Sequence, residues 1–441
     1  MRYAETGINL EIDLTRGNIE RVQTDPRDTE LYLGGLGTNA KILWDRVSPE
    51  VEPFSPENLL IFSAGLLCGT PAIGCNRTIV STISPQTRLM AFSMMGGFWA
   101  PELKYAGYDK VILRGKSPDL VYLWINNDKV EIRDASHLAG KGATETAAQI
   151  RQELNQPKAQ VAAIGLAGEN RVYFASIEQG RSSASRLGIG AVMGDKGVKA
   201  IAVRGSGDIS VAKPLEYLEL CNEVMEYIKF RNENPIPGVM AILQGLGSPQ
   251  EMATHDEKWH TENFMWGNSR ERRRDFWTDD IKRAWTQTME GMRTRLISCY
   301  NCPMKCGATI SPPGQPTYMM KCFSKLTYTM AAMSDLDFGL RIAQHATEYG
   351  VDGVSTPQVM AFAVELYENG ILSDDDMPGF PSDSEGRFYW LLDRIVRREG
   401  IGDILAHGTY GASNESGGGA GAWAQRGLVS HGRLGVGRCV G

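Results

Sequence analysis

Three closely spaced cysteines are the residues of this chain whose type and spacing point most directly to chemistry. They are Cys299, Cys302 and Cys306, and Cys322 follows in the same segment. A C-x2-C-x3-C run can aim three thiolates at one inorganic centre from a single short turn. A [4Fe–4S] cluster takes four cysteine thiolates, one of which often comes from elsewhere in the chain. Zinc also binds cysteines spaced in this way, so the run predicts an iron–sulfur centre or a zinc centre.

A second concentration of ionisable side chains lies between Glu251 and His260. In a helix, Glu251 and His255 would share one face because they are four residues apart. With Glu257 and His260 nearby, the stretch could hold zinc, although it lacks the H-E-x-x-H pattern of zinc proteases. A solvated polar stretch is the other interpretation, and the residues alone leave both open.

Glycine-rich loops in the first two hundred residues have the composition of loops that bind phosphate. Residues 34–37 (Gly-Gly-Leu-Gly) and 94–99 (Met-Met-Gly-Gly-Phe-Trp) each precede a short helical pattern, which would present backbone N–H groups to an anion. Residues 181–194 combine arginines with small residues, and a guanidinium group can clamp phosphate. Each loop alone reads as a structural turn, and none is a Rossmann fingerprint. Together, with Arg77 nearby, they predict one large anionic cofactor.

The spacing of apolar residues predicts the elements that position these groups. Residues 8–14 alternate between apolar and polar types, and residues 15–18 form a turn signal before a second alternating run, which indicates a hairpin. Further strand patterns continue to about residue 204. From Pro214 to about residue 410 the apolar residues recur mostly at helical spacing. These patterns predict an α+β fold, with a β-rich first part followed by a mostly α-helical part.

We expect three segments along the chain. Residues 1–208 form the β-rich domain, and residues 209–414 form the helical domain with the cysteine run. Residues 415–441 are rich in glycine and lack a helical pattern, so we interpret them as an aberrant or disordered tail. The chain would then be truncated before a second helical domain.

Composition excludes several classes of protein. The chain has 42% hydrophobic residues and a formal net charge of −6, so a nucleic-acid-binding protein is not expected. Its first residues lack the apolar core of a signal peptide, and no apolar run reaches the length of a membrane span. Eight cysteines in such a chain indicate thiols or metal ligands in a reducing cytoplasm.

Two longer segments carry a resemblance to a known family. Residues 96–109 (Gly-Gly-Phe-Trp-Ala-Pro-Glu-Leu-Lys-Tyr-Ala-Gly-Tyr-Asp) and 190–201 (Gly-Ala-Val-Met-Gly-Asp-Lys-Gly-Val-Lys-Ala-Ile) resemble the aldehyde:ferredoxin oxidoreductase family. The cysteine run fits the cluster motif of that family. Residues 349–355 (Tyr-Gly-Val-Asp-Gly-Val-Ser) resemble its pterin-contacting loop in the helical part. The resemblance extends from residue 1 to about residue 414.

The resemblance implies a set of cofactors and the residues that hold them. Members of the family carry tungsten, or sometimes molybdenum, on two pyranopterins, with Mg²⁺ bridging the pterin phosphates and a [4Fe–4S] cluster nearby. Residues 1–208 would be the domain that binds both pterins, and Cys299, Cys302 and Cys306 would be cluster ligands. The residues expected around the pterins are Asn76, Arg77, Ser93, Gly96, Gly97, Arg181, Arg186, Gly188, Gly190 and Asp352.

One departure from the family changes the expected reaction. Members that oxidise aldehydes carry an acidic stretch soon after the cluster cysteines, whereas residues 317–325 here contain no carboxylate. The chain is similar instead to the tungsten subunit of class II benzoyl-CoA reductases. In that branch a cysteine thiolate joins the tungsten, and Cys322 is the candidate. The other interpretations of Cys322 are a fourth cluster ligand and a buried small hydrophobic residue.

The resemblance therefore implies reduction of benzoyl-CoA to a cyclic dienoyl-CoA, with electrons arriving through the [4Fe–4S] cluster. His260 and Glu251 would supply protons, since burial raises the pKa of a carboxyl group. The implied partners are an acyl-CoA substrate and an iron–sulfur electron-transfer subunit or ferredoxin, in an oligomer. The alternatives are interconversion of an aldehyde and a carboxylic acid, or an inactive fragment or zinc-binding structural protein.

Overall fold

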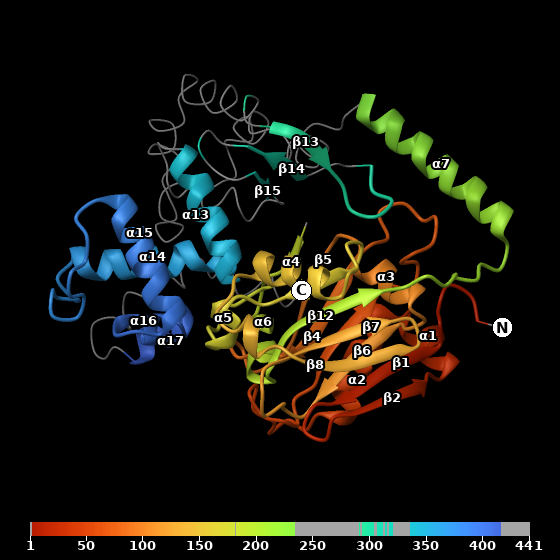
Figure 1. Cartoon of the computed structure of the whole chain (residues 1–441), viewed down its shortest axis with the longest axis horizontal. Coiled ribbons are helices and arrows are strands. Elements are labelled where there is room, and N and C mark those ends of the chain that lie inside the picture. The colour runs from red at the N-terminus through yellow and green to blue at the C-terminus, as the bar shows by residue number, and fades with distance from the viewer. Residues whose placement is uncertain are drawn as a thin grey trace.

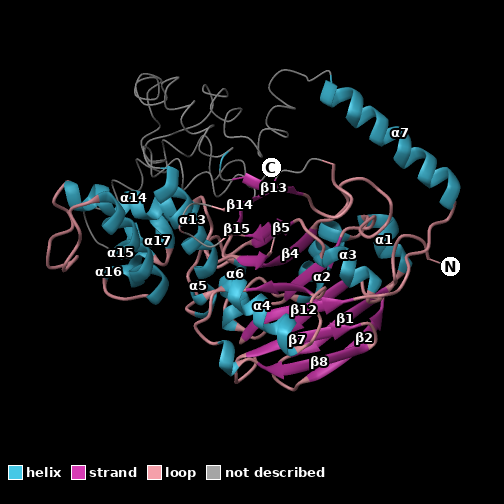
Figure 2. Ribbon diagram, turned by 45° about the horizontal axis from the view of Figure 1, so that its top comes forward, coloured by secondary structure: helices cyan, strands magenta, loops and turns pink. Residues whose placement is uncertain are grey.

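The computed structural model describes residues 2–180, 182–233, 291, 293–303, 307–311, 314, 317–320 and 336–415. Figure 1 shows the strands of the first two hundred residues gathered in one body, with the helices of residues 336–415 beside it. The turned view in Figure 2 shows the same separation of strands and helices. The predicted α+β fold, with a β-rich part followed by a helical part, is confirmed.

The first sheet has six strands in the order β2-β1-β6-β3-β4-β5. Its members are β1 (Ile8–Asp13), β2 (Asn18–Gln23), β3 (Leu60–Ala64), β4 (Thr78–Ile83), β5 (Met90–Met95) and β6 (Lys110–Arg114). The predicted hairpin is formed by β1 and β2, with Ile8 opposite Gln23. The pair β1 and β6 is parallel, and the other neighbours are antiparallel.

The second sheet also has six strands, in the order β11-β10-β9-β12-β7-β8. Its members are β7 (Val121–Asn126), β8 (Lys129–Asp134), β9 (Gln160–Ala163), β10 (Ile177–Gln179), β11 (Ser182–Ala184) and β12 (Val198–Arg204). As in the first sheet, one pair is parallel, here β7 with β12.

One apolar core joins the facing sides of the two sheets. Leu10 and Val111 of the first sheet and Leu123 and Ile201 of the second belong to the same cluster of fully or almost fully buried side chains. The helices α3 (Trp99–Tyr105) and α6 (Ile189–Asp195) contribute to it. The indole of Trp99 also donates a hydrogen bond to the Ile201 carbonyl at 3.1 Å. Burial of this apolar surface is the main contribution to the stability of the β-rich body.

Further helices cover the outer faces of the sheets. The helix α2 (Gly35–Arg46) packs Leu43 against the first sheet, and α4 (Ala143–Glu153) packs Ile150 against the second. The short helix α1 (Pro26–Tyr32) precedes α2, and Asp25 caps its first turn. The remaining short helices of this part are η1 (Ser136–Leu138) and α5 (Leu166–Glu169).

The helical part is built from α13 (Leu336–Tyr349), α14 (Ser355–Glu368), α15 (Ser384–Arg397), α16 (Ile401–Leu405) and α17 (Gly408–Glu415). Its apolar core continues into the β-rich part, because Phe174 and Ala175 pack in one cluster with Ile342 and Phe362. Backbone hydrogen bonds join the two parts directly. The Ser176 N–H donates to the Gly350 carbonyl at 2.7 Å, and the Asp352 N–H donates to the Phe174 carbonyl at 2.9 Å.

Two further elements lie between the β-rich part and the helical part in the sequence, and the second of them contains the cysteine run. The helix α7 (Pro214–Glu233) follows the last strand of the second sheet and stands at the side of the body in Figure 1. A three-stranded antiparallel sheet follows, formed by β13 (Arg293–Ile297), β14 (Gly307–Ile310) and β15 (Tyr318–Met320). The helical spacing of this region gave no sign of that sheet. Among the helices of the described residues, none is both long enough and apolar enough to span a bilayer.

Lys110 is a charged residue on the buried side of the first sheet, beneath α2, and only 5% of it is exposed. Burial lowers the pKa of Lys110 to about 8, whereas a free lysine titrates near 10.4. The unfolded chain therefore binds more protons than the folded chain between these two values. The contribution of Lys110 to the free energy of unfolding is therefore lowest below pH 8 and rises as the pH increases towards 10.

The substitution Lys110→Met is expected to raise the free energy of unfolding by about 2 kcal/mol near pH 7, because it removes the cost of a buried charge. This advantage over the wild type should shrink as the pH approaches about 10. Urea unfolding of both proteins at several pH values measures it. Lys129→Met, at a side chain that is 64% exposed, is the matched control. An advantage of Lys110→Met that grows with pH would contradict the expectation.

Candidate functional site

The first two cysteines of the run lie on a tight turn between β13 and β14. The Cys302 N–H donates a hydrogen bond to the Cys299 carbonyl at 3.3 Å, and Asn301 adopts the left-handed conformation with φ 43°. Neither cysteine forms a disulfide with another described residue, and both are partly exposed. The turn therefore presents two sulfur atoms that an inorganic centre could reach.

Hydrogen bonds attach this turn to loops of the β-rich part. The Tyr300 N–H donates to the Gly97 carbonyl at 3.1 Å, and the Asn76 side chain donates to the Tyr300 carbonyl at 2.9 Å. The Gly74 N–H donates to the Asn301 carbonyl at 2.9 Å. Residues more than 200 positions apart in the sequence are thus held together by the backbone of the turn itself.

The Tyr300 side chain anchors the turn further. Its hydroxyl lies 2.8 Å from the Tyr105 hydroxyl and donates to the Gly69 carbonyl at 3.1 Å. Its ring packs edge-on against Phe98 and Tyr105, with centroids 6.1 and 6.4 Å away. Burial raises the pKa of Tyr105 well above its ordinary value. The Tyr105 phenol therefore stays protonated and able to donate a hydrogen bond at neutral pH.

Gly96 is the point at which the predicted cofactor residues meet. A Cβ atom on Gly96 would lie 2.8 Å from the Cys299 sulfur and 3.4 Å from both Arg77 Nη1 and Asn76 Oδ1. The Gly96 N–H donates to the Ser182 hydroxyl at 2.8 Å. The absence of a side chain is thus what allows a cysteine, an arginine and an asparagine to converge here.

The neighbouring residue brings a further polar group to the same place. A Cβ atom on Gly97 would lie 2.0 Å from Gln179 Oε1. This oxygen is buried and accepts no hydrogen bond from any residue that the structure describes, while the Gln179 amide group donates to Gln160 at 3.0 Å. Because buried acceptors are normally satisfied, the oxygen is available to an N–H or O–H group of a bound cofactor.

A second set of predicted residues spans the contact between the β-rich and helical parts. Arg186 Nη1 donates to the Asp352 carboxylate at 3.2 Å, and that carboxylate also accepts from the N–H and the hydroxyl of Ser355. The Arg186 N–H donates to the Ser93 hydroxyl at 3.2 Å. The structure therefore brings together Ser93, Arg186 and Asp352, which the sequence places far apart.

Packing alone requires glycine at residues 188 and 190, whether or not a cofactor binds there. Cβ atoms on them would lie 2.3 Å from the Tyr173 carbonyl oxygen and 2.6 Å from the Ser176 carbonyl oxygen, respectively. Gly188 is also left-handed, with φ 67°. Their spacing is explained by the close approach of α6 to this backbone, so it gives no independent indication of a ligand.

The other predicted site residues lie outside the described part of the chain. These are Arg181, Glu251, His260, Cys306 and Cys322. Among the described cysteines, burial raises the pKa of Cys68 to about 11 and also raises that of Cys75. Both remain neutral thiols near pH 7, so neither is a ready thiolate ligand.

The donor set fits an anionic cofactor next to a soft metal centre. It combines the two partly exposed cysteine side chains of the turn, the exposed guanidinium group of Arg77 and the half-exposed group of Arg186. The unsatisfied oxygen of Gln179 adds an acceptor for heterocyclic N–H groups. Thiolates bind iron–sulfur clusters and soft metals, and guanidinium groups bind phosphates.

Sequence reasoning missed Tyr300 and Gln179. Tyr300 stands between two conspicuous cysteines, but its type alone gives no sign of the contacts that it makes. Gln179 lies two residues before the arginine-containing loop, and Ser182 lies within it; the contacts of both depend on the approach of Gly96 and Gly97. Only the nearness of that loop in the sequence could have suggested Gln179.

Two family descriptions match most of the chain. Residues 9–205 match the family described as "Aldehyde ferredoxin oxidoreductase, N-terminal domain". Residues 223–429 match "Aldehyde ferredoxin oxidoreductase, domains 2 & 3", a match that extends beyond the described residues at the C-terminal end.

Curated relatives carry similar names. The chain is 34% identical over 420 residues to the "Tungsten-containing aldehyde ferredoxin oxidoreductase" of Pyrococcus abyssi, covering 91% of this chain and 66% of that protein. It is 32% identical to the "Aliphatic sulfonate oxidoreductase, WOR-like subunit" of Pyrococcus furiosus, covering 93% of this chain and 67% of the relative. The chain thus spans about two thirds of the length of these relatives.

A solved structure is more similar. It is described as "Active site complex BamBC of Benzoyl Coenzyme A reductase in complex with 1,5 Dienoyl-CoA". The matching chain is 77% identical, with a TM-score of 0.90, and the match covers 96% of this chain and 65% of that one.

The substitution Tyr300→Phe tests whether the tyrosine anchors the cysteine turn. Loss of its hydroxyl removes one hydrogen bond to the Gly69 carbonyl and the contact with Tyr105, which should weaken the attachment by about 1 kcal/mol. Limited proteolysis should then cleave at residues 298–302 several times faster, while circular dichroism stays unchanged. Tyr410→Phe, at a tyrosine that is 61% exposed, is the control. Equal cleavage rates for both variants would show that the anchor is unimportant.

Proposed function

Because this chain belongs to the aldehyde ferredoxin oxidoreductase family, we propose that it is a tungsten–pterin oxidoreductase subunit that reduces benzoyl-CoA to a cyclic dienoyl-CoA. The observation that carries this proposal is the 77% identity to a chain of the benzoyl-CoA reductase complex, over 96% of this chain. The lack of a carboxylate in residues 317–325 also supports reduction of benzoyl-CoA rather than oxidation of an aldehyde.

The pterin cofactor would be held by residues that the structure brings to two places. Arg77, Asn76, Gly96 and Gly97 surround one of them, with Gln179 offering its free oxygen. At the other, Arg186, Ser93 and Asp352 form a chain of hydrogen bonds. We propose that Arg181, Gly188 and Gly190 complete the set, and that Mg²⁺ bridges the phosphates.

The cysteine turn would supply thiolates to a [4Fe–4S] cluster through Cys299, Cys302 and Cys306. Its attachment to Gly97 and Asn76 fixes the turn against the loops proposed to bind pterin. Cys322 would provide either a thiolate ligand to tungsten or the fourth ligand of the cluster. In either role its soft sulfur suits the metal.

When bound, the cluster and the tungsten centre would supply two electrons at low potential. Reduction of an aromatic ring to a diene also consumes two protons, which the protein must deliver to ring carbons. We propose that His260 and Glu251 donate them, since a histidine titrates near neutral pH and burial raises the pKa of a carboxyl group. The surrounding protein would keep water away from the reducing centre.

The proposed partners follow from this chemistry. An acyl-CoA thioester is the substrate, and an iron–sulfur subunit or ferredoxin delivers the electrons to an oligomeric enzyme. We also propose a reducing cytoplasm as the location, because cysteines that form no disulfide are typical of that compartment. We also propose that residues 1–208 form the pterin-binding domain and that residues 209–414 form the helical domain with the cysteine run.

Metal analysis of anaerobically purified protein is the decisive experiment. We expect tungsten near about one and iron near about four per chain. In Cys299→Ala the iron content should fall several-fold, while the matched variant Cys75→Ala should keep it. Zinc near about one without iron or tungsten would overturn the redox proposal and support a structural zinc protein.

Substrate choice is tested separately with the metal-loaded protein. A low-potential reductant and benzoyl-CoA should give a dienoyl-CoA two mass units heavier, because two hydrogen atoms are added, and mass spectrometry of the thioesters detects it. Glu251→Gln and His260→Gln should each lower the rate by about a hundredfold. Oxidation of aldehydes without turnover of benzoyl-CoA would favour the aldehyde oxidoreductase alternative.

A further inference from the structure

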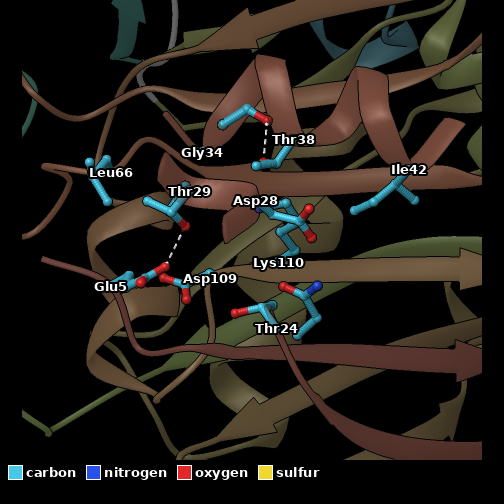
Figure 3. A pocket seen from close by; sticks show the side chains of 13 residues that line it. Glu5, Thr24, Asp28, Thr29, Gly34, Thr38, Ile42, Leu66, Asp109 and Lys110 are labelled. Carbon is cyan, nitrogen blue, oxygen red and sulfur yellow. Dashed lines mark hydrogen bonds between the residues drawn. The ribbon is translucent and has the colours of Figure 1, made fainter. Parts of the chain in front are cut away.

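A small, half-open hollow lies at the start of α2. It is built from α1, the strands β1, β3 and β6, and the N-terminal segment, none of which contributes to the cysteine turn (Figure 3). Gly34 and Gly35 belong to one of the glycine-rich loops with phosphate-binding composition, but the proposed redox function assigns no role to the residues that line this hollow.

Two polar side chains on the floor of this hollow have no hydrogen-bond partner among the described residues. The Lys110 side chain is 5% exposed and forms no hydrogen bond or ion pair with a described residue, although the charges of Asp109, Glu5 and Asp28 act on it. Asn9 is 7% exposed, and its Oδ1 is buried and unsatisfied. The two residues are paired in the register of the parallel strands β1 and β6, so they lie side by side. Buried polar groups of this kind are normally satisfied. A ligand that completes them needs an acceptor for Lys110 and a donor for Asn9.

The start of α2 adds a second attraction for an anionic acceptor. This helix has twelve residues, and no side chain caps its first turn at Gly34, which lines the hollow with Gly35. The first-turn N–H groups of a helix favour a negative charge. Lys110 and this helix terminus thus present positive potential to the same hollow.

Carboxylates on the other walls favour a positively charged donor. Asp109 is fully engaged by Lys104, Thr6 and Gly7, but Asp28 and Glu5 also line the hollow. Glu5 accepts a hydrogen bond from Thr29 at 2.6 Å and has Arg2 at 3.9 Å. Figure 3 shows Lys110 among Glu5, Asp28 and Asp109. A simple anion would be repelled by these groups, whereas an ammonium group would be attracted.

We propose that this hollow binds a small zwitterion that carries one carboxylate and one ammonium group, such as an amino acid. The carboxylate is recognised by Lys110 and the start of α2. The ammonium group is recognised by Asn9 Oδ1, Asp28 and Glu5. Adjacent strands lie about 4.8 Å apart, a separation that the two ends of a small amino acid can bridge.

Isothermal titration calorimetry of the full chain tests the proposal with glycine, L-alanine, β-alanine and γ-aminobutyrate as probes, and with acetate and methylamine as single-charge controls. We expect saturable binding of at least one zwitterion and at least tenfold weaker binding of both controls. Absence of saturable heat with all four zwitterions would overturn the proposal and leave water as the partner of these groups. Equal binding of acetate would also overturn it, in favour of a plain anion site.

Substitutions then identify which residues bind the carboxylate and which bind the ammonium group of the ligand. Lys110→Met should weaken binding of the zwitterion at least tenfold, and Lys129→Met should leave it unchanged. Asp28→Asn is a conservative change at a partly exposed position that should preserve the fold. This substitution should weaken binding of the zwitterion several-fold without weakening binding of acetate. Unchanged affinity in both Lys110→Met and Asp28→Asn, with unfolding curves that show folded proteins, would place the binding elsewhere and overturn the assignment.

Discussion

The approach of the Cys299 sulfur to the bare backbone of Gly96 sets how closely the two halves of the candidate active site can meet. A side chain at residue 96 would occupy the space next to the sulfur, with its Cβ only 2.8 Å away. The hydrogen bond from Tyr300 to Gly97 and the one from Asn76 to Tyr300 both depend on this approach. Glycine at this position is therefore a condition for bringing a redox centre and a cofactor loop together.

A glycine also allows the helical part to approach the β-rich part closely. A Cβ atom on Gly165 would lie 2.3 Å from the Glu348 carbonyl oxygen, so only glycine lets α13 end this close to the second sheet. The loop after α13 then continues the hydrogen bonding of the β-rich part through Gly350 and Asp352. Asp352 is carried to Arg186 by this contact. The position of one candidate cofactor residue thus depends on backbone packing some distance from its side chain.

The sequence allowed the hairpin of β1 and β2, the overall α+β fold and the turn made by Cys299 and Cys302 to be predicted, because each follows from local spacing. It did not allow Tyr300 or Gln179 to be identified. Their partners, Gly97 and Asn76 among them, are distant in the chain, and neither residue type is distinctive. The three-stranded sheet of β13 to β15 was missed for a similar reason. Its strands are three to five residues long, too short to establish a period.

The parallel pairing of β1 with β6 has a consequence for how the chain acquires its fold. Asn9 pairs with Lys110, so β1 must wait for about 100 more residues before its second neighbour exists. At ordinary rates of synthesis this delay is on the order of 5 to 20 s. During it the edge of β1 that later pairs with β6 is open and the apolar face of the β1–β2 hairpin is unburied, and an isolated hairpin is marginally stable in water. A nascent chain of this protein therefore passes through a period in which a chaperone that covers apolar strands would protect it from aggregation.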